Sequence, residues 1–247
     1  LAVYCLVALL LVTCLGLSMW ALDLEVTTAV GGVLILVGMW IPAVARLVTV
    51  RTVDRGWKAP FPLKQWGRPR LWVILGPLLV VIAIYSAAYL AAVVAGIELA
   101  EPAWRGASLA VNLAFNAPLL ILLGLFGGLG EELGWRGYLQ PRLDQAGIRA
   151  SLPIVIVVET LFHVPIFALA GYLESSSLLV TILLFLALKI AWVPMLAWGT
   201  YRLRSIWFAA MYHSIHNGFS QTLFPKALGA GEETVLGEAG IFPVACY

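Results

Sequence analysis

The sequence predicts an all-α protein, a polytopic bundle of about eight transmembrane helices. Of its 247 residues, 62% are hydrophobic and only 11% are charged, whereas soluble domains carry roughly 25% charged residues. A folded chain of this composition has too little polar surface to cover itself in water. Long apolar segments also recur from one end of the chain to the other. We therefore expect an integral, multi-pass membrane protein in contact with membrane lipids.

Each predicted transmembrane helix is an apolar segment of about 20 residues, the length that crosses a bilayer. Seven full spans and a partial eighth satisfy this criterion, near residues 2–22, 27–48, 71–97, 108–130, 151–170, 178–200, 205–224 and 235–247. We divide them into three N-terminal spans, residues 1–104, and a core of spans four to eight, residues 105–247. The two parts are expected to form one integrated membrane domain.

The ends of spans four and eight follow from the residues at their borders. The helix of span four is expected to continue past Arg136, because Pro141 is the first strong helix breaker after it. The chain starts at Leu1 rather than Met and stops at Tyr247 in an apolar segment. From this we expect a fragment clipped at both ends, with a truncated last span.

Basic residues distinguish one set of loops from the other. The connections after spans two, four and six are basic, and the remaining connections are mainly acidic. The basic set is Arg46, Arg51, Arg55, Lys58, Lys64, Arg68, Arg70, Arg136, Arg142, Arg149, Arg202 and Arg204, and the acidic set is Asp23, Glu25, Glu98, Glu101, Glu174, Glu232 and Glu233. Because cytoplasmic loops are rich in Lys and Arg, this alternation predicts that the basic loops face the cytoplasm. No basic run is interleaved with aromatic residues, so no nucleic-acid partner is expected.

Two adjacent glutamates interrupt the fourth apolar segment. Residues four apart share a helix face, so Glu132 is predicted to form a structural ion pair with Arg136. Glu131 points to a different face, which carries no local cation. Ionisable groups inside a membrane are costly and mark functional sites, and a buried carboxylate is a candidate general acid or base. Glycines spaced four apart surround the pair and allow neighbouring helices to approach closely: Gly124 with Gly128, and Gly130 with Gly134.

Span five contains His163, with Glu159 one helical turn before it. The Glu159 carboxylate is expected to orient the imidazole by accepting a hydrogen bond from one ring nitrogen, as carboxylates beside functional histidines often do. In span seven, His213 and Asn217 share one face. An imidazole and an amide together can donate hydrogen bonds to a developing oxyanion, and a polar clasp between helices is the alternative. His216 lies off that face and is predicted to be mainly structural.

More than one chemistry is compatible with these residues. Glu131, His163 and His213 would satisfy a zinc centre with one open position, yet no HExxH spacing is present. The sequence leaves open both a divalent metal such as zinc and a metal-free mechanism with activated water. A serine nucleophile is less favoured, because no GxSxG motif precedes Ser214. Proton-coupled transporters also bury acids and histidines, but they often show internal repeats, and this chain has no convincing one.

Three motifs together resemble those of a known family. They are GEELGWRGYLQPRL at residues 130–143, His163-Val164-Pro165, and His213-x-x-x-Asn217. In this order they are similar to the motifs of the CPBP family, the CAAX prenyl endopeptidases and bacteriocin-processing proteins, also called the ABI family. The resemblance covers roughly residues 105–247 and extends to the later stretch Gly237-Glu238-Ala239-Gly240.

The resemblance implies an eight-helix bundle with a cavity open to the cytoplasmic side, and proteolysis of membrane-associated or lipid-anchored substrates. By motif position, Glu131 and His163 would activate water, His213 and Asn217 would stabilise the oxyanion, and Glu132 and Arg136 would support them. We expect a bacterial or archaeal plasma membrane, and bacterial members of the family need not act on prenylated substrates. A non-proteolytic bacteriocin-immunity or scaffold protein of the same fold is the alternative.

One residue departs from the family's pattern. The second motif is usually Phe-x-x-x-His, and Glu159 stands here at the Phe position. A carboxylate one turn before His163 would stabilise the cationic ring. We therefore expect a shifted pH optimum rather than a loss of activity.

Overall fold

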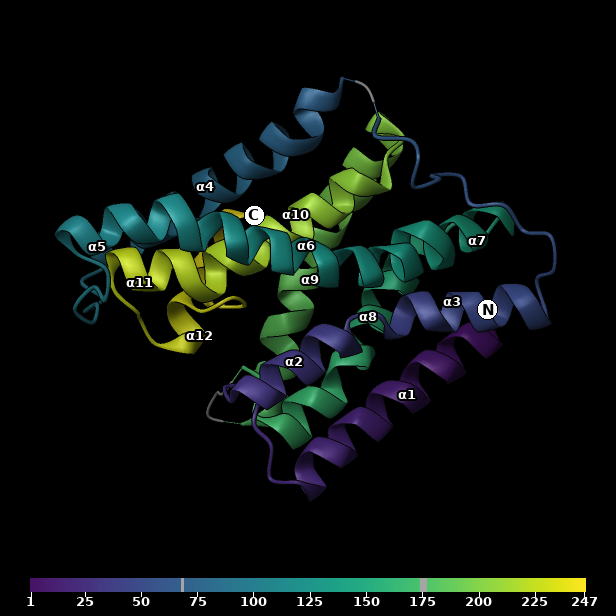
Figure 1. The fold of residues 1–247 in the computed structure, drawn as a ribbon, viewed down its shortest axis with the longest axis horizontal. Helices are drawn as coiled ribbons and strands as arrows, with labels where there is room; N and C mark the ends of the chain where they lie inside the picture. The colour runs from purple at the N-terminus through teal and green to yellow at the C-terminus, as the bar shows by residue number, and fades with distance from the viewer. Residues whose placement is uncertain (68, 174–176) are drawn as a thin grey trace.

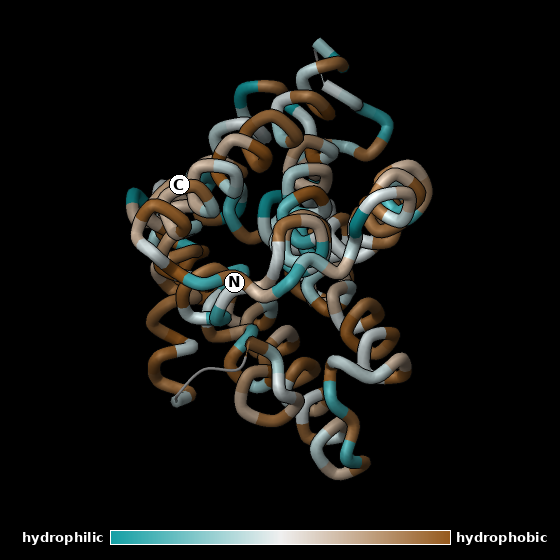
Figure 2. The backbone as a smooth tube through the Cα atoms, turned by 90° about the vertical axis from the view of Figure 1, so that its left-hand side faces the viewer, coloured by the Kyte–Doolittle hydropathy of each residue, from teal (hydrophilic) through white to brown (hydrophobic). Residues whose placement is uncertain are grey.

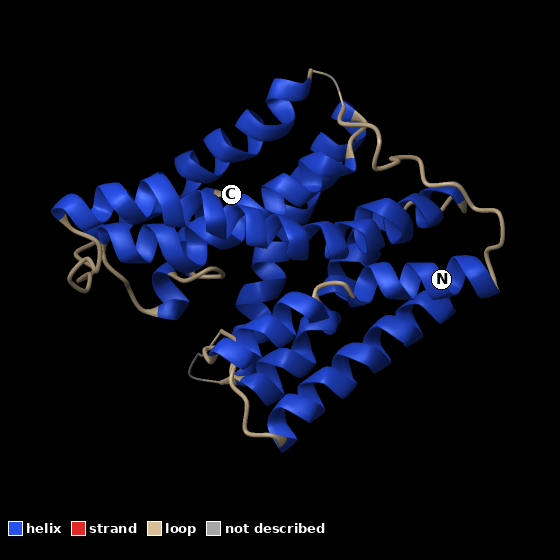
Figure 3. Ribbon diagram, viewed as in Figure 1, coloured by secondary structure: helices blue, strands red, loops and turns tan. Residues whose placement is uncertain are grey.

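A computed structural model describes residues 1–247 except 68 and 174–176, and within these described residues it consists of helices and loops without a strand (Figures 1 and 3). The all-α prediction is confirmed. Arg68 and Glu174, both used in the predicted loop topology, lie outside the described residues. Within the described residues, six helices are long and apolar enough to cross a membrane: Ala2–Ala21, Ala29–Thr52, Arg70–Val94, Gly106–Gln145, Ser151–Ala170 and Leu178–Leu203.

The first three spans correspond to α1 (Ala2–Ala21), the pair α2 (Ala29–Gly38) and α3 (Ile41–Thr52), and α4 (Arg70–Val94). Helix α2 begins at a Thr28 side chain that accepts a hydrogen bond from the Gly31 amide at 3.0 Å, the usual N-cap arrangement. Helix α3 begins with Pro42 in its first turn, where the missing amide hydrogen is not needed. Spans five and six are α8 (Ser151–Ala170) and α9 (Leu178–Leu203).

The predicted seventh and eighth spans differ from the structure. Residues 206–228 are helical, as α10 (Ile206–Gly218), the π-helix η3 (Phe219–Leu223) and α11 (Phe224–Leu228), but they are not among the six apolar helices. Histidine, asparagine and glutamine side chains make this segment more polar than the others. The prediction of an eighth span is wrong, because 235–247 contains the end of α12 (Glu233–Leu236) and the separate α13 (Ile241–Cys246). A glycine-flanked turn at residues 237–240 divides them.

The long fourth span is widened at two places by π-helical turns. It runs through α5 (Gly106–Val111), η1 (Asn112–Asn116), α6 (Ala117–Gly134), η2 (Trp135–Leu139) and α7 (Gln140–Gln145). A proline follows two residues after each π-helix of the molecule: Pro118, Pro141 and Pro225. Proline lacks an amide hydrogen and its ring collides with the carbonyl one turn back, and a wider turn relieves both problems. The helix therefore continues past Arg136, as predicted, and also past Pro141, which does not end it.

Helix α6 lies at the centre of the bundle and packs against α10 on one side and α3 on the other (Figure 1). Glycines make this possible. A Cβ atom added at Gly128 would meet the Ala210 carbonyl oxygen of α10 at 3.2 Å, and one added at Gly134 would meet the Pro42 side chain of α3 at 2.3 Å. The predicted role of the glycine spacing in close helix packing is confirmed.

The molecule is apolar outside and charged inside, the reverse of a soluble protein. Leu122 and Val94 are 63% and 79% exposed, as residues that face lipid are. Figure 2 shows hydrophobic residues along most helical turns, with hydrophilic residues mainly at the loops and near the centre of the view. Among the described residues, the buried charges belong to α6, η2, α8 and α9 and to Glu238 before α13, and Glu131, Lys189 and Glu238 line one cavity.

Candidate active site

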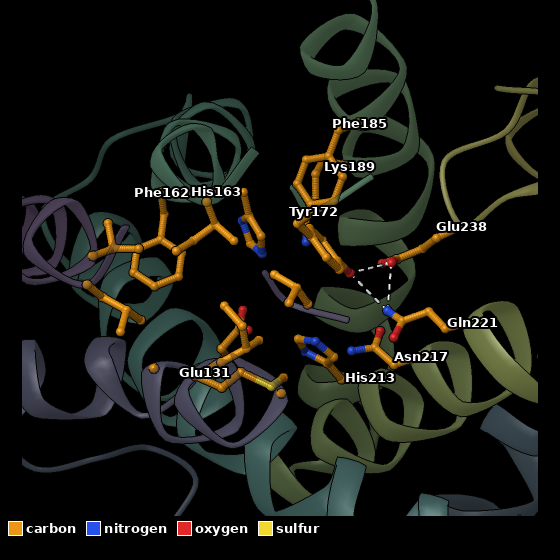
Figure 4. Close-up of a pocket in the computed structure, with 18 of the residues that line it drawn as sticks. Glu131, Phe162, His163, Tyr172, Phe185, Lys189, His213, Asn217, Gln221 and Glu238 are labelled. Atoms are coloured by element: carbon orange, nitrogen blue, oxygen red, sulfur yellow. Dashed lines mark hydrogen bonds between the residues drawn. The ribbon is translucent and has the colours of Figure 1, made fainter. Parts of the chain in front are cut away.

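One cavity of about 290 Å³ brings together the four residues predicted to act in catalysis. Glu131 comes from α6, His163 from α8, and His213 and Asn217 from α10, and all four line the cavity (Figure 4). Helices α1, α2 and α9 supply much of the remaining wall, largely with apolar side chains. Residues from both predicted parts of the chain, 1–104 and 105–247, therefore enclose the same space.

Glu131 is held at the cavity wall by a neighbouring tryptophan. Its side chain belongs to a residue only 3% exposed, and Trp135 Nε1 donates a hydrogen bond to its Oε2 at 3.2 Å. Trp135 is itself fully buried and packs edge-on against Phe162. Figure 4 shows the Glu131 carboxylate directed toward the space between His163 and His213.

Glu132 points away from Glu131 and forms the predicted ion pair. Its Oε2 lies 3.1 Å from Arg136 Nη1, and neither side chain is exposed. The other oxygen, Oε1, lies 3.0 Å from His213 Nδ1. A carboxylate can only accept hydrogen bonds in its ionised form, so Nδ1 of His213 carries a proton. Glu132 thus fixes the orientation of the His213 ring, and the sequence alone did not reveal this contact.

His163 is oriented by a backbone group. Its Nδ1 lies 2.7 Å from the backbone carbonyl oxygen of Glu159, which can only accept, so Nδ1 is the donor and Nε2 carries the free lone pair of the neutral ring. The prediction that the Glu159 carboxylate orients this imidazole is wrong. That carboxylate turns instead to Arg136, at 2.6 Å, and to Lys189, at 3.5 Å. The expected effect of Glu159 on the pH optimum through direct contact with His163 therefore loses its basis.

Asn217 lies beside His213 on the cavity side of α10 (Figure 4). Among the described residues, its buried Oδ1 has no hydrogen-bond partner. This oxygen is therefore not engaged in a polar clasp between helices. His216, by contrast, does not line the cavity: its Nδ1 pairs with the Tyr247 hydroxyl, and its ring packs against Trp192.

Two groups of cavity residues were missed in the sequence. Glu238 accepts hydrogen bonds from the Tyr172 hydroxyl at 2.5 Å and from Gln221 Nε2 at 2.7 Å, opposite Glu131 (Figure 4). Lys189 of α9 lines the cavity and is 3% exposed. It is a lone charge in the sixth apolar segment, so the criterion that singled out the glutamates could have found it. Nothing in the sequence linked Tyr172 and Gln221 to Glu238.

The donor set does not fit a metal ion in this arrangement. Within the described part of the chain, no three His, Cys, Asp or Glu side chains are placed so that they could hold one. The trio Glu131, His163 and His213 lines the cavity from three sides but is not close enough together, within the described residues, to form such a group.

Residues 112–219 match the family model described as type II CAAX prenyl endopeptidase, Rce1-like. This match agrees with the resemblance of the three motifs to the CPBP family. The matched stretch contains all seven residues singled out from the motifs, whereas Gln221 and Glu238 follow it. At the family level the match supports a CAAX-type intramembrane endopeptidase, an integral multi-pass membrane protein with a peptide or protein substrate. A comparison with curated proteins found no match.

Proposed function

We propose that the cavity hydrolyses a peptide bond of a membrane-associated or lipid-anchored substrate, with water activated by Glu131 and His163. The observation that carries the proposal is the convergence of Glu131, His163, His213 and Asn217 on one buried cavity from three helices. Acid–base groups and hydrogen-bond donors around one small space are what acyl transfer requires.

Water activation falls to two groups that face each other across the cavity. The ionised Glu131 carboxylate and the free Nε2 lone pair of His163 can each accept a hydrogen bond from one water molecule. The water oxygen attacks the scissile carbonyl carbon and its proton passes to Glu131. When the carbon–nitrogen bond breaks, that proton is delivered to the leaving amine, so the site returns to its starting state. General acid–base catalysis of this kind contributes roughly 10²–10⁴-fold to rate.

Oxyanion stabilisation falls to α10. The Asn217 amide can donate to the tetrahedral oxyanion whatever the protonation state of its neighbours. His213 has its Nδ1 proton committed to Glu132, so its Nε2 donates only as the imidazolium, which the adjacent carboxylate stabilises. The two residues are therefore unequal partners, with Asn217 the unconditional donor.

The test is cleavage in nanodiscs of a panel of CAAX-type and leader peptides, lipidated and unmodified, with and without a strong chelator. We expect Glu131→Gln and His163→Ala to lower kcat by about 10²-fold or more, with both proteins still folded. Glu98→Gln, a change at an exposed glutamate in the same chain, is the matched control and should cleave like the parent. Equal cleavage by Glu131→Gln and the parent would contradict the assignment.

A further inference from the structure

Lys189 is a buried cation that the proposed mechanism does not use. It lies within α9, 3% exposed, at the edge of the cavity. Its Nζ lies 4.2 Å from the ring centre of Trp192 and 4.7 Å from that of Phe185. Both distances are within the range of cation–π attraction. A buried ammonium is nevertheless unfavourable unless a carboxylate pairs with it, and the carboxylate beside it is Glu159, at 3.5 Å.

Lys189 is one end of a chain of charged contacts whose other end, His213, also lines the cavity. From Lys189 the chain passes to Glu159, then to Arg136 at 2.6 Å, to Glu132 at 3.1 Å, and to His213 at 3.0 Å. Two carboxylates and two basic side chains alternate along it, so in their ionised forms the charges of the buried cluster cancel. Neither carboxylate oxygen of Glu159 has an aligned hydrogen bond, so charge balance, more than hydrogen-bond geometry, holds Glu159 in place.

Removing the Lys189 charge would leave one guanidinium to serve two buried carboxylates. Arg136 would then be drawn toward Glu159 and away from Glu132, since both compete for the same Nη1 atom. Glu132 is the group that fixes the His213 ring.

We infer that Lys189 is a positioning residue: by neutralising Glu159 it leaves Arg136 to hold Glu132, and Glu132 to hold His213. For its effect on catalysis the inference rests on the proposed function. It requires that Lys189 and Glu159 be needed as a pair, so that losing both charges does less harm than losing either one alone.

The kinetic test is a double-mutant cycle with Lys189→Met, Glu159→Gln and both together. We expect each single change to lower kcat by about tenfold or more, with a smaller effect on KM, and the double variant to recover to within about threefold of the parent, because charges in one network couple strongly. Lys189→Arg should retain most activity. Lys226→Met, which removes another lysine that lies over an aromatic ring, that of Trp104, should behave like the parent.

A double variant as impaired as Lys189→Met would overturn the inference and indicate that Lys189 contacts substrate directly. Should Lys189→Met fail to fold, Glu159→Gln tests the same charge pair by removing its negative member, which leaves one cation in excess. The double variant must then exceed Glu159→Gln in activity and in thermal stability. Equal or lower values would also overturn the inference.

A second measurement does not depend on activity. The chain has three histidines, so the ¹⁵N signals of the imidazoles in nanodiscs can be assigned with single His variants. Lys189→Met should move the His213 nitrogen signals, and Glu159→Gln/Lys189→Met should return them toward the parent positions. Unchanged His213 signals in Lys189→Met would overturn the positioning role even if no peptide substrate were found. If the signals move as expected while the parent cleaves nothing, the proposed function is contradicted, whereas the positioning of His213 by Lys189 and Glu159 is supported.

Discussion

At the scale of single residues, hydrogen-bond partners decide what each cavity group can do. The Glu159 backbone carbonyl makes Nδ1 of His163 a donor, and Glu132 does the same for His213. Both rings therefore present Nε2 to the cavity as an acceptor while they are neutral. Asn217 lines the same cavity, and its side-chain NH2 group is a donor in every protonation state of its neighbours.

This unequal division predicts how changes at α10 will differ. Asn217→Ala should lower kcat by about 10²–10³-fold with little change in KM, the scale found when one oxyanion donor is removed. The loss should be the same across the pH range in which the parent is active, because the amide does not titrate. Peptide cleavage at a series of pH values measures both features. Ser220→Ala, a buried polar change one turn further along, serves as the control.

At the scale of the elements, the π-helical turn η2 and the glycine face of α6 place the site. The wider turn lets one helix carry Glu131, Glu132 and Arg136 and continue through Pro141 without a break. The glycines then bring α3 and α10 against the same helix. Without that close approach, His213 of α10 could not reach Glu132 of α6.

The glycine face predicts a contrast between two alanine substitutions. Gly134→Ala would place a methyl group 2.3 Å from the Pro42 side chain and 2.6 Å from its backbone. We expect α3 to be displaced at a cost of about 1–3 kcal/mol, as for overpacked cores. Gly76 lies in helix α4, and a Cβ atom added there would have its nearest neighbour, Phe208, at 3.7 Å. Gly76→Ala should therefore be neutral or stabilising, because alanine favours helix. Thermal unfolding in nanodiscs compares the two, and equal melting temperatures would contradict the packing argument.

At the scale of the whole molecule, a polar clamp joins Asp54, just after the second apolar helix, to the C-terminal end of the long helix Gly106–Gln145. Asp54, just after α3, accepts hydrogen bonds from Arg142 Nε at 2.6 Å and Nη2 at 2.9 Å, and from the Tyr138 hydroxyl at 2.8 Å. These contacts join segments 88 residues apart in sequence. The hydrogen bonds from Arg142 lower the pKa of the Asp54 carboxyl below its ordinary value.

The clamp predicts a pH-dependent stability. Because the pKa of Asp54 is lower in the folded state, its contribution is complete above the unfolded value of about 4 and is lost as pH falls through the folded value. Asp54→Asn should therefore lower the melting temperature at pH 7, and the gap to the parent should close in acid. Asp23→Asn, in the exposed α1–α2 connection, should show no such gap. A gap that persists unchanged at low pH would refute the role of the charge.

How much could be predicted from sequence depended on whether the signal was local. Apolar runs of bilayer length predicted six of the spans, because hydrophobicity needs no knowledge of neighbours. The eighth predicted span failed because glutamates and glycines at 232–240 interrupt the apolar run and end α12 before α13 begins. The pair Glu132–Arg136 was predictable because both residues lie on one helix.

By itself, the sequence determined the class of protein, most of its helices and four of the polar residues that line the cavity, since a polar side chain in an apolar segment is conspicuous wherever it lies. Only the tertiary structure decided which groups meet. In the structure, the Glu159 carboxylate contacts Arg136 and Lys189 rather than His163. Glu132 pairs with His213, and Glu238 lines the cavity. These contacts join different helices, and their geometry depends on how closely the helices pack, which spacing along one chain does not encode.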